Sequence, residues 1–198
     1  MELIKNAKSQ ICLLAYEFVP GEATNKVEEA LIRAAGQGVA VRVLVDNEVP
    51  GADAFVERLL AGGASAQLDD VGTAHAKMLV ADQSFALVGS TNLSTSSLRF
   101  NHEVNLLFSD PLAVGTALNY CTGRQGDVSL WFDVASPAGS NPQVFGDRAR
   151  GEVLKEAIEA AQERIDIVIY TVNATFEDGP ASDLLKQEHL GFLLLCIN

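Results

Sequence analysis

Apolar residues along the first half of the chain alternate between strand-like runs and helix-like spacing. Residues 11–18 (ICLLAYEF) and 39–46 (VAVRVLVD) are almost continuous apolar runs of strand length, and the second is rich in β-branched residues. Between them, apolar residues recur at helical spacing over residues 27–34, before the glycines at positions 36 and 38. A strand, a helix and a strand with short links predict a right-handed crossover between parallel strands.

The same alternation continues as far as residue 120. A second helix is predicted near residues 52–61 and ends at a pair of glycines. Four strand-like segments and a further helix follow, and we place the strands near 64–68, 76–81, 85–88 and 104–108 and the helix near 112–120. This order of elements predicts an α/β protein.

A linker and an internal repeat divide the rest of the chain. Residues 134–146 are rich in Ser, Pro, Gly and Asn, which is typical of a linker. After them, residues 158–172 align without gaps with residues 4–18 at an offset of 154, and self-similarity at a fixed offset indicates a duplicated unit. We therefore predict a first unit at 1–133, a linker at 134–147 and the truncated start of a second unit at 148–198.

Composition and charge restrict the class of protein. The chain of 198 residues is 48% hydrophobic and 20% charged, as in soluble α/β proteins, and its net charge is −12. An acidic surface repels phosphate backbones, so non-specific binding to nucleic acid is disfavoured. We identify no signal peptide, and no apolar run approaches the ~20 residues of a membrane helix. These features leave the compartment unknown and favour a cytoplasmic or membrane-peripheral location.

Neither a disulfide framework nor a metal site is expected from the sequence. The three cysteines, Cys12, Cys121 and Cys196, are odd in number and far apart, and they form no C-x-x-C pair. We therefore predict free thiols, with Cys12 buried in a strand, which favours a reducing compartment. The acidic residues at 46–48 and 69–70 are interpreted as solvated loop carboxylates, and no metal or cofactor is expected.

The array HAKMLVAD contains the residues that most restrict the chemistry. His75, Lys77 and Asp82 form an H-x-K-x-x-x-x-D pattern. In an extended strand, His75 and Lys77 project from the same side about 7 Å apart. An unprotonated imidazole can attack phosphorus, and a neighbouring ammonium can neutralise charge on the non-bridging oxygens. Asp82, at the end of the run, is expected to support the following turn.

Further polar residues follow this array in an order that suits phosphoryl transfer. The sequence GSTN begins at Gly89, and its Ser90 and Asn92 can both offer hydrogen-bond donors to a phosphoryl oxygen if the segment is extended. Glu103 follows, and its carboxylate can hold the second nitrogen of His75 and fix the imidazole tautomer. The residues together supply a nucleophile, a phosphate clamp and an orienting carboxylate.

With these motifs the chain resembles the phospholipase D superfamily, whose signature is H-x-K-x4-D followed by G-S-x-N. The resemblance covers about residues 4–120 and the start of a second unit behind them. It implies an α/β fold with a mixed, largely parallel β-sheet flanked by helices, and a metal-independent phosphodiesterase or phosphatidyltransferase with a site built between two such motifs. It also implies residue roles: His75 as the nucleophile, Lys77, Ser90 and Asn92 as phosphate binders, Glu103 as the orienting partner, and Asp82 and Gly89 as structural motif residues.

The second motif is missing from the chain, and this leaves the function open. A phosphorylated histidine cannot at the same moment protonate the leaving alkoxide, so another acid is required. His102 and His189 are interpreted as incidental. The acid is expected from a second H-x-K motif near position 229, in a missing C-terminal half, or from His75 of a homodimer mate.

Three functions therefore remain. The chain is expected to be a metal-independent phosphodiester hydrolase or phosphatidyltransferase that acts on phospholipids through a phosphohistidine. The alternatives are an endonuclease-type phosphodiesterase acting as a homodimer and an inactive fragment that lacks the second motif. The expected partner is a phospholipid or other phosphodiester substrate, and nucleic acid is less favoured because of the acidic charge.

Overall fold

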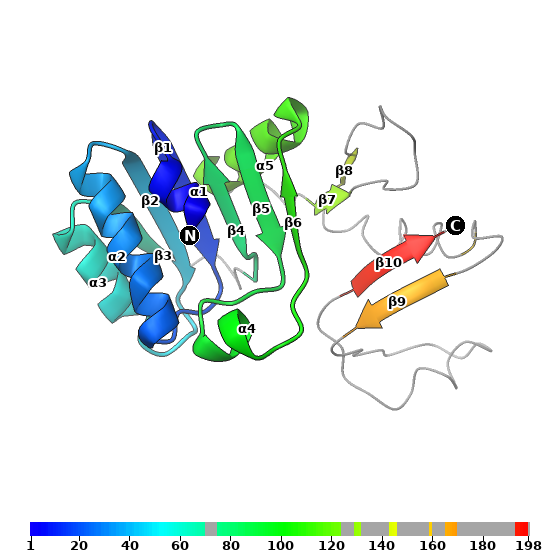
Figure 1. Cartoon of the computed structure of the whole chain (residues 1–198), viewed down its shortest axis with the longest axis horizontal. Coiled ribbons are helices and arrows are strands. Elements are labelled where there is room, and N and C mark those ends of the chain that lie inside the picture. Colours follow the sequence, from blue (N-terminus) through cyan, green and yellow to red (C-terminus); the bar gives the residue numbers. More distant parts are fainter. Residues whose placement is uncertain are drawn as a thin grey trace.

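A six-stranded β-sheet with helices on both faces forms the main part of this computed structural model (Figure 1). The structure describes residues 1–69 and 75–123, and beyond them residue 159 and four short strands. The helices are α1 (Glu2–Asn6), α2 (Glu22–Gly36), α3 (Ala52–Ala61), α4 (Thr95–Arg99) and α5 (Pro111–Gly123). The strands of the sheet are β1 (Gln10–Ala15), β2 (Ala40–Asp46), β3 (Ser65–Asp69), β4 (Met78–Ala81), β5 (Phe85–Gly89) and β6 (Asn105–Phe108).

The sheet is mixed, with strand order β3-β2-β1-β4-β5-β6. This confirms the predicted α/β fold with a mixed sheet and the parallel crossover from β1 through α2 to β2. The expectation of a largely parallel sheet is wrong, because β1–β2 and β2–β3 are parallel whereas β1–β4, β4–β5 and β5–β6 are antiparallel. The three-residue link between β4 and β5 is too short for a parallel crossover, which needs a dozen residues or more.

Most predicted elements are present, with shifts at their ends. β1 ends at Ala15, because the following backbone leaves the sheet to pair with Leu93, whose carbonyl accepts from the Val19 amide at 2.8 Å. β4 begins at Met78, so His75 and Lys77 lie just before the strand rather than on it. The helices α1 and α4 were not predicted, since five residues are too few to show a helical period.

Alternating side chains of the central strands build two hydrophobic cores. From β1, Ile11 and Leu13 face the core shared with α1, α2 and α3, whereas Cys12 and Leu14 face the core shared with α5. Figure 1 shows the same division, with α1, α2 and α3 over one face of the sheet and α5 behind the other. A strand that is buried on both faces carries a continuous apolar run, which explains the run in the sequence.

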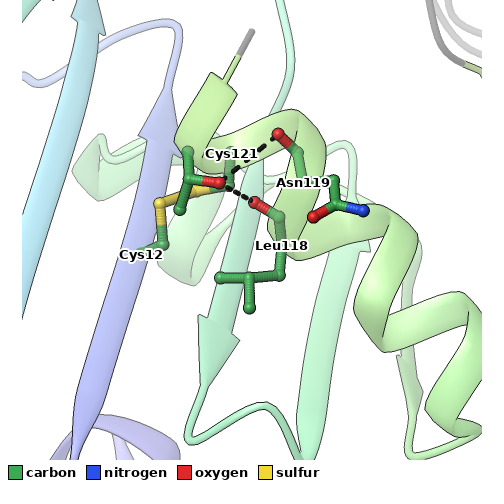
Figure 2. The surroundings of a disulfide bond; sticks show 5 residues. Cys12, Leu118, Asn119 and Cys121 are labelled. Atoms are coloured by element: carbon green, nitrogen blue, oxygen red, sulfur yellow. Dashed lines mark hydrogen bonds between the residues drawn. A yellow bond between two sulfur atoms is a disulfide. The ribbon is translucent and has the colours of Figure 1, made fainter. Parts of the chain in front are cut away.

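A disulfide joins Cys12 of β1 to Cys121 of α5 (Figure 2). The predicted free thiols at these two positions are therefore wrong, and the inference of a reducing compartment loses its support. The two residues are 109 positions apart in the sequence. No local spacing could reveal the pair, because packing of α5 on the sheet brings them together. The side chain of Cys196 lies outside the described residues.

The C-terminal third is described only as short strands. These are β7 (Ser129–Trp131), β8 (Gln143–Phe145), β9 (Ile165–Ile169) and β10 (Leu193–Ile197), paired antiparallel as β7–β8 and β9–β10. Shifting β1 by the repeat offset of 154 gives residues 164–169, which nearly coincide with β9. Strand β8 lies within the range predicted as a linker, whereas the rest of that range, His189 and the domain boundaries fall outside the described residues. The division into two units therefore stays a prediction. Among the described helices, none is long and apolar enough to cross a membrane.

Candidate active site

The topology gathers the predicted site residues at one edge of the sheet. β4 runs antiparallel to β1, so the segment before β4 lies beside the carboxyl end of β1. β5 returns antiparallel to β4, and its last residue, Gly89, pairs with the first residue of β6. His75 and Lys77, the GSTN segment and Glu103 therefore meet at the same edge although they span 29 residues of sequence.

His75 and Lys77 contact each other directly. The Lys77 Nζ donates to the His75 carbonyl oxygen at 2.8 Å and lies 3.0 and 3.1 Å from Nδ1 and Nε2 of the imidazole. The Lys77 side chain thus curls back onto the residue two positions before it. Tyr16 completes the cluster, because its ring centroid lies 4.5 Å from that of His75 and 4.8 Å from the Lys77 Nζ.

The surroundings of this pair lower both pKa values. Partial burial, followed by the positive charge of Lys77, lowers the pKa of His75 from its ordinary value, although Asp46 acts in the opposite direction. Burial lowers the pKa of Lys77 to about 8, against the effects of Glu103, Glu17 and Asp46. The imidazole is therefore neutral at neutral pH while most of the lysine carries its charge.

Glu103 makes its side-chain hydrogen bonds with residues other than His75. Its Oε2 accepts a hydrogen bond from the Ser90 hydroxyl, and its Oε1 accepts from the Asn101 amide at 3.3 Å. Within the part of the chain that the structure describes, no hydrogen bond joins Glu103 to His75, so the expected orienting contact is absent. Burial alone would raise the pKa of Glu103, but hydrogen bonds from Ser90, Ser97 and Asn101 and the charge of Lys77 lower it, so the carboxylate is ionised.

Ser90 and Asn92 lie at the turn that follows β5. The Ser90 hydroxyl donates to Glu103 and accepts from the Val104 amide at 3.0 Å, so it joins the end of β5 to the start of β6. The Oδ1 of Asn92 is buried and has no hydrogen-bond partner among the described residues. A buried amide oxygen without a partner is costly, which favours a ligand or a rearrangement at this position.

Gly89 fits a place where two strands approach closely. A Cβ atom built at this position would lie within 3 Å of the Val104 carbonyl oxygen and of both side-chain and backbone atoms of Asn105. The glycine is therefore needed for the β5–β6 pairing, which in turn places Ser90 beside Glu103.

Asp82 lies at the opposite end of β4 from His75. Its carboxylate accepts from the backbone amides of Lys8, Ser9 and Gln10 at 2.7, 2.7 and 3.1 Å, which joins the β4–β5 turn to the start of β1. Burial would raise the pKa of Asp82, but these hydrogen bonds lower it to about 2. A hollow of about 320 Å³ between this turn and α1 is also at this end of the sheet, away from His75.

Sequence reasoning missed the parts played by Tyr16 and Asp46. Tyr16 lies within the repeated segment 4–18, and no residue motif indicates its contact with His75. The expectation that Asp46 and Asp69 are solvated is wrong, since both are buried at the ends of β2 and β3. His102 is exposed. Among the described residues, no group of three or more His, Cys, Asp or Glu side chains could hold a metal ion.

Solved structures show the same fold at low sequence identity. A phospholipase D family member, Nuc from Salmonella typhimurium, is 22% identical with a TM-score of 0.54, covering 62% of this chain and 82% of that protein. Polyphosphate kinase from Porphyromonas gingivalis is 18% identical, also with a TM-score of 0.54, covering 80% of this chain and 27% of that protein. At this identity the likeness concerns the fold.

Sequence comparison extends the likeness to curated proteins. A probable cardiolipin synthase of Bacillus subtilis, YwiE, is 31% identical over 121 residues, which cover 58% of this chain and 24% of the relative. A cardiolipin synthase of Listeria welshimeri is 37% identical over 166 residues, covering 80% of this chain and 32% of the relative. The chain thus spans about a quarter to a third of the length of these relatives. The family described as cardiolipin synthase, PLD-like domain, matches residues 1–121. The chain therefore belongs to this PLD-like family.

Proposed function

We propose that this chain carries one of the two H-x-K motifs of a metal-independent phosphodiester hydrolase or phosphatidyltransferase. This enzyme would act on phospholipids through a phosphohistidine at His75. The observation that carries the proposal is the contact of a charged Lys77 with a neutral, partly exposed imidazole. A neutral imidazole has a free electron pair, and an adjacent cation favours an anionic phosphodiester.

The first step joins an imidazole nitrogen of His75 to phosphorus and breaks the bond from phosphorus to the leaving oxygen. Lys77, Ser90 and Asn92 are the phosphate binders in this proposal. A bound phosphate would draw the Lys77 ammonium from the ring nitrogens towards the phosphoryl oxygens, which leaves a nitrogen free to attack. In the second step, water or an alcohol attacks the phosphohistidine and restores the imidazole.

The leaving alkoxide needs a proton that this cluster does not supply once His75 is phosphorylated. We assign that acid to a second H-x-K motif, either in a C-terminal half or in a second copy of the chain. The predicted division at 1–133, 134–147 and 148–198, in which a second PLD-like unit would start at residue 148, favours the first source.

The substrate class rests on the names of the curated relatives. Those relatives are cardiolipin synthases, which supports a phospholipid and transfer to an alcohol. The net charge of −12 also disfavours a nucleic-acid backbone. The structural likeness to Nuc concerns the fold and does not favour the endonuclease function.

The decisive experiment separates attack by His75 from protonation of the leaving group. The full chain is mixed, in EDTA, with a nitrophenyl phosphodiester, whose leaving group departs as a stable anion and needs no acid. We expect a burst of nitrophenolate and an acid-labile phosphoryl group on the protein. His75→Asn should show neither, whereas the matched variant of an exposed histidine, His102→Asn, should show both.

The same chain is then tested on phospholipid vesicles and on single-stranded DNA. We expect phospholipid turnover to be slow for the chain alone and to rise when a C-terminal half carrying a second H-x-K motif is added. An unlabelled wild-type protein with the nitrophenyl diester would contradict the phosphohistidine and support an inactive fragment. Cleavage of DNA alone, by a dimer, would support the endonuclease.

A further inference from the structure

Tyr16 is the aromatic residue that contacts both His75 and Lys77. It follows the last residue of β1, and the segment before β4 is its neighbour across the antiparallel pair. Its ring centroid is 4.5 Å from that of His75, with the two planes tilted by 52°. Its ring also lies 4.8 Å from the Lys77 Nζ, which is within the range of a cation–π contact. One side chain therefore touches both members of the pair.

The backbone that carries Tyr16 is fixed on both sides. Before it, Leu14 and Ala15 pair with strands on the two sides of β1. After it, the Leu93 amide donates to the Glu17 carbonyl at 3.2 Å, and the Val19 amide donates to the Leu93 carbonyl at 2.8 Å. A ring anchored in this way can hold a neighbouring group, unlike a side chain on a free loop.

The carboxylate that was expected to orient His75 is engaged elsewhere. Both oxygens of Glu103 accept hydrogen bonds from other side chains, Ser90 and Asn101. Among the described residues, the His75 ring has its hydrogen-bond contacts with Lys77 and its aromatic contact with Tyr16. Since Lys77 must turn towards a bound phosphate, the contact that can persist through the reaction is the one with Tyr16.

We propose that Tyr16 is the positioning residue for His75 and Lys77: its ring holds the imidazole in a fixed orientation and guides the ammonium between the imidazole and the substrate phosphate. The kinetic part of this inference rests on the proposed function, whereas the positioning of the imidazole does not. The sequence has Tyr170 at the equivalent place of the repeat, 154 residues on, as a second unit would need.

The groups around His75 and Lys77 determine how the pKa of His75 should change when the Tyr16 ring is removed. The charge of Lys77 lowers the pKa of His75, whereas Asp46 at the end of β2 raises it. The carboxylates of Glu103, Glu17 and Asp46 raise the pKa of Lys77. Burial is the largest cause of the lowered pKa of His75, and Tyr16 is one of the groups that cover the ring. Replacing Tyr16 by a smaller residue should therefore expose the imidazole and raise its pKa.

The test uses the full chain and three variants. Tyr16→Leu removes the ring, Tyr16→Phe keeps it without the hydroxyl, and Tyr120→Leu is the matched control, because Tyr120 is also half-buried but lies on α5. The pKa of His75 is measured by NMR titration of its ring protons, with the signals assigned through His75→Asn. Turnover of the nitrophenyl diester is measured beside it.

We expect Tyr16→Leu to raise the pKa of His75 and to lower kcat by about 10- to 100-fold with a smaller change in KM, as a misplaced reacting group does. Tyr16→Phe should keep the His75 pKa and kcat close to the wild-type values, and Tyr120→Leu should change neither. A His75 pKa in Tyr16→Leu equal to that of the wild type overturns the inference, whether or not the chain turns over a diester. An active wild type with an equally active Tyr16→Leu overturns it while the proposed function stands.

Discussion

The protonation states of two residues determine how the candidate site should depend on pH. Attack requires neutral His75, whose pKa lies below its ordinary value, and phosphate binding requires protonated Lys77, whose pKa is about 8. Activity should therefore rise with pH through the His75 pKa, on the acidic side of neutrality, and fall as pH rises past about 8. Initial rates on the nitrophenyl diester from pH 5 to 10 measure this profile.

Lys77→Arg identifies the group behind the alkaline fall. A guanidinium stays charged throughout this range, so the variant should lose the fall near pH 8 while its activity at pH 7 is lower, because its fork geometry differs from that of an ammonium. A fall near pH 8 that persists in Lys77→Arg would assign it to another group.

Asp82 contributes to stability rather than to this pH profile. Its folded pKa of about 2 lies below its ordinary value of 3.8, so its contribution is present above about pH 4 and is lost as pH falls through about 2. Asp82→Asn should lower the free energy of unfolding at pH 7 by about 1 kcal/mol, less than the full pKa difference implies, because solvent screens the site. Urea unfolding checks this, and Glu57→Gln, an exposed carboxylate of α3, should show no such loss.

At the scale of elements, the site depends on the close pairing of β5 with β6. Gly89→Ala places a methyl group against the Val104 carbonyl and Asn105, so the strands must separate. We expect a loss of about 1–3 kcal/mol in unfolding free energy, together with reduced activity, since Ser90 and Glu103 are placed by this pair. Gly36→Ala is the control: nothing lies within 4 Å and it ends α2, so it should be neutral or slightly stabilising. Equal stability of the two variants would contradict this account.

The elements themselves could be predicted because each carries its own pattern. α3 was predicted at its observed bounds, and the alternating cores explain why β1 and β2 appear as continuous apolar runs. Pairing between strands could not be predicted in the same way, since it depends on which ends meet in space. For this reason the motif residues His75, Ser90 and Glu103 were found by spacing, whereas the contacts of Glu103 with Ser90 and of Tyr16 with His75 were not.

At the scale of the whole molecule, the Cys12–Cys121 disulfide joins the centre of the sheet to the helix that covers its second face. It connects residues 109 positions apart, and a long closed loop restricts the unfolded chain strongly. Loss of the bond should therefore lower the free energy of unfolding by about 2–4 kcal/mol. Denaturant unfolding of the oxidised chain, of the chain refolded under reductant and of the Cys12→Ala/Cys121→Ala variant measures this difference.

The reduced wild type separates the bond from the packing of its side chains. The reduced protein keeps both buried sulfur atoms, so its decrease in unfolding free energy measures the effect of the bond alone. The double alanine variant also loses packing in the core beneath α5. Amide exchange should become faster in α5 first, because the bond is the covalent connection between that helix and β1. Cys196→Ser should unfold like the wild type, since Cys196 is not a member of the bond. An unchanged unfolding free energy on reduction would show that packing alone holds α5 on the sheet.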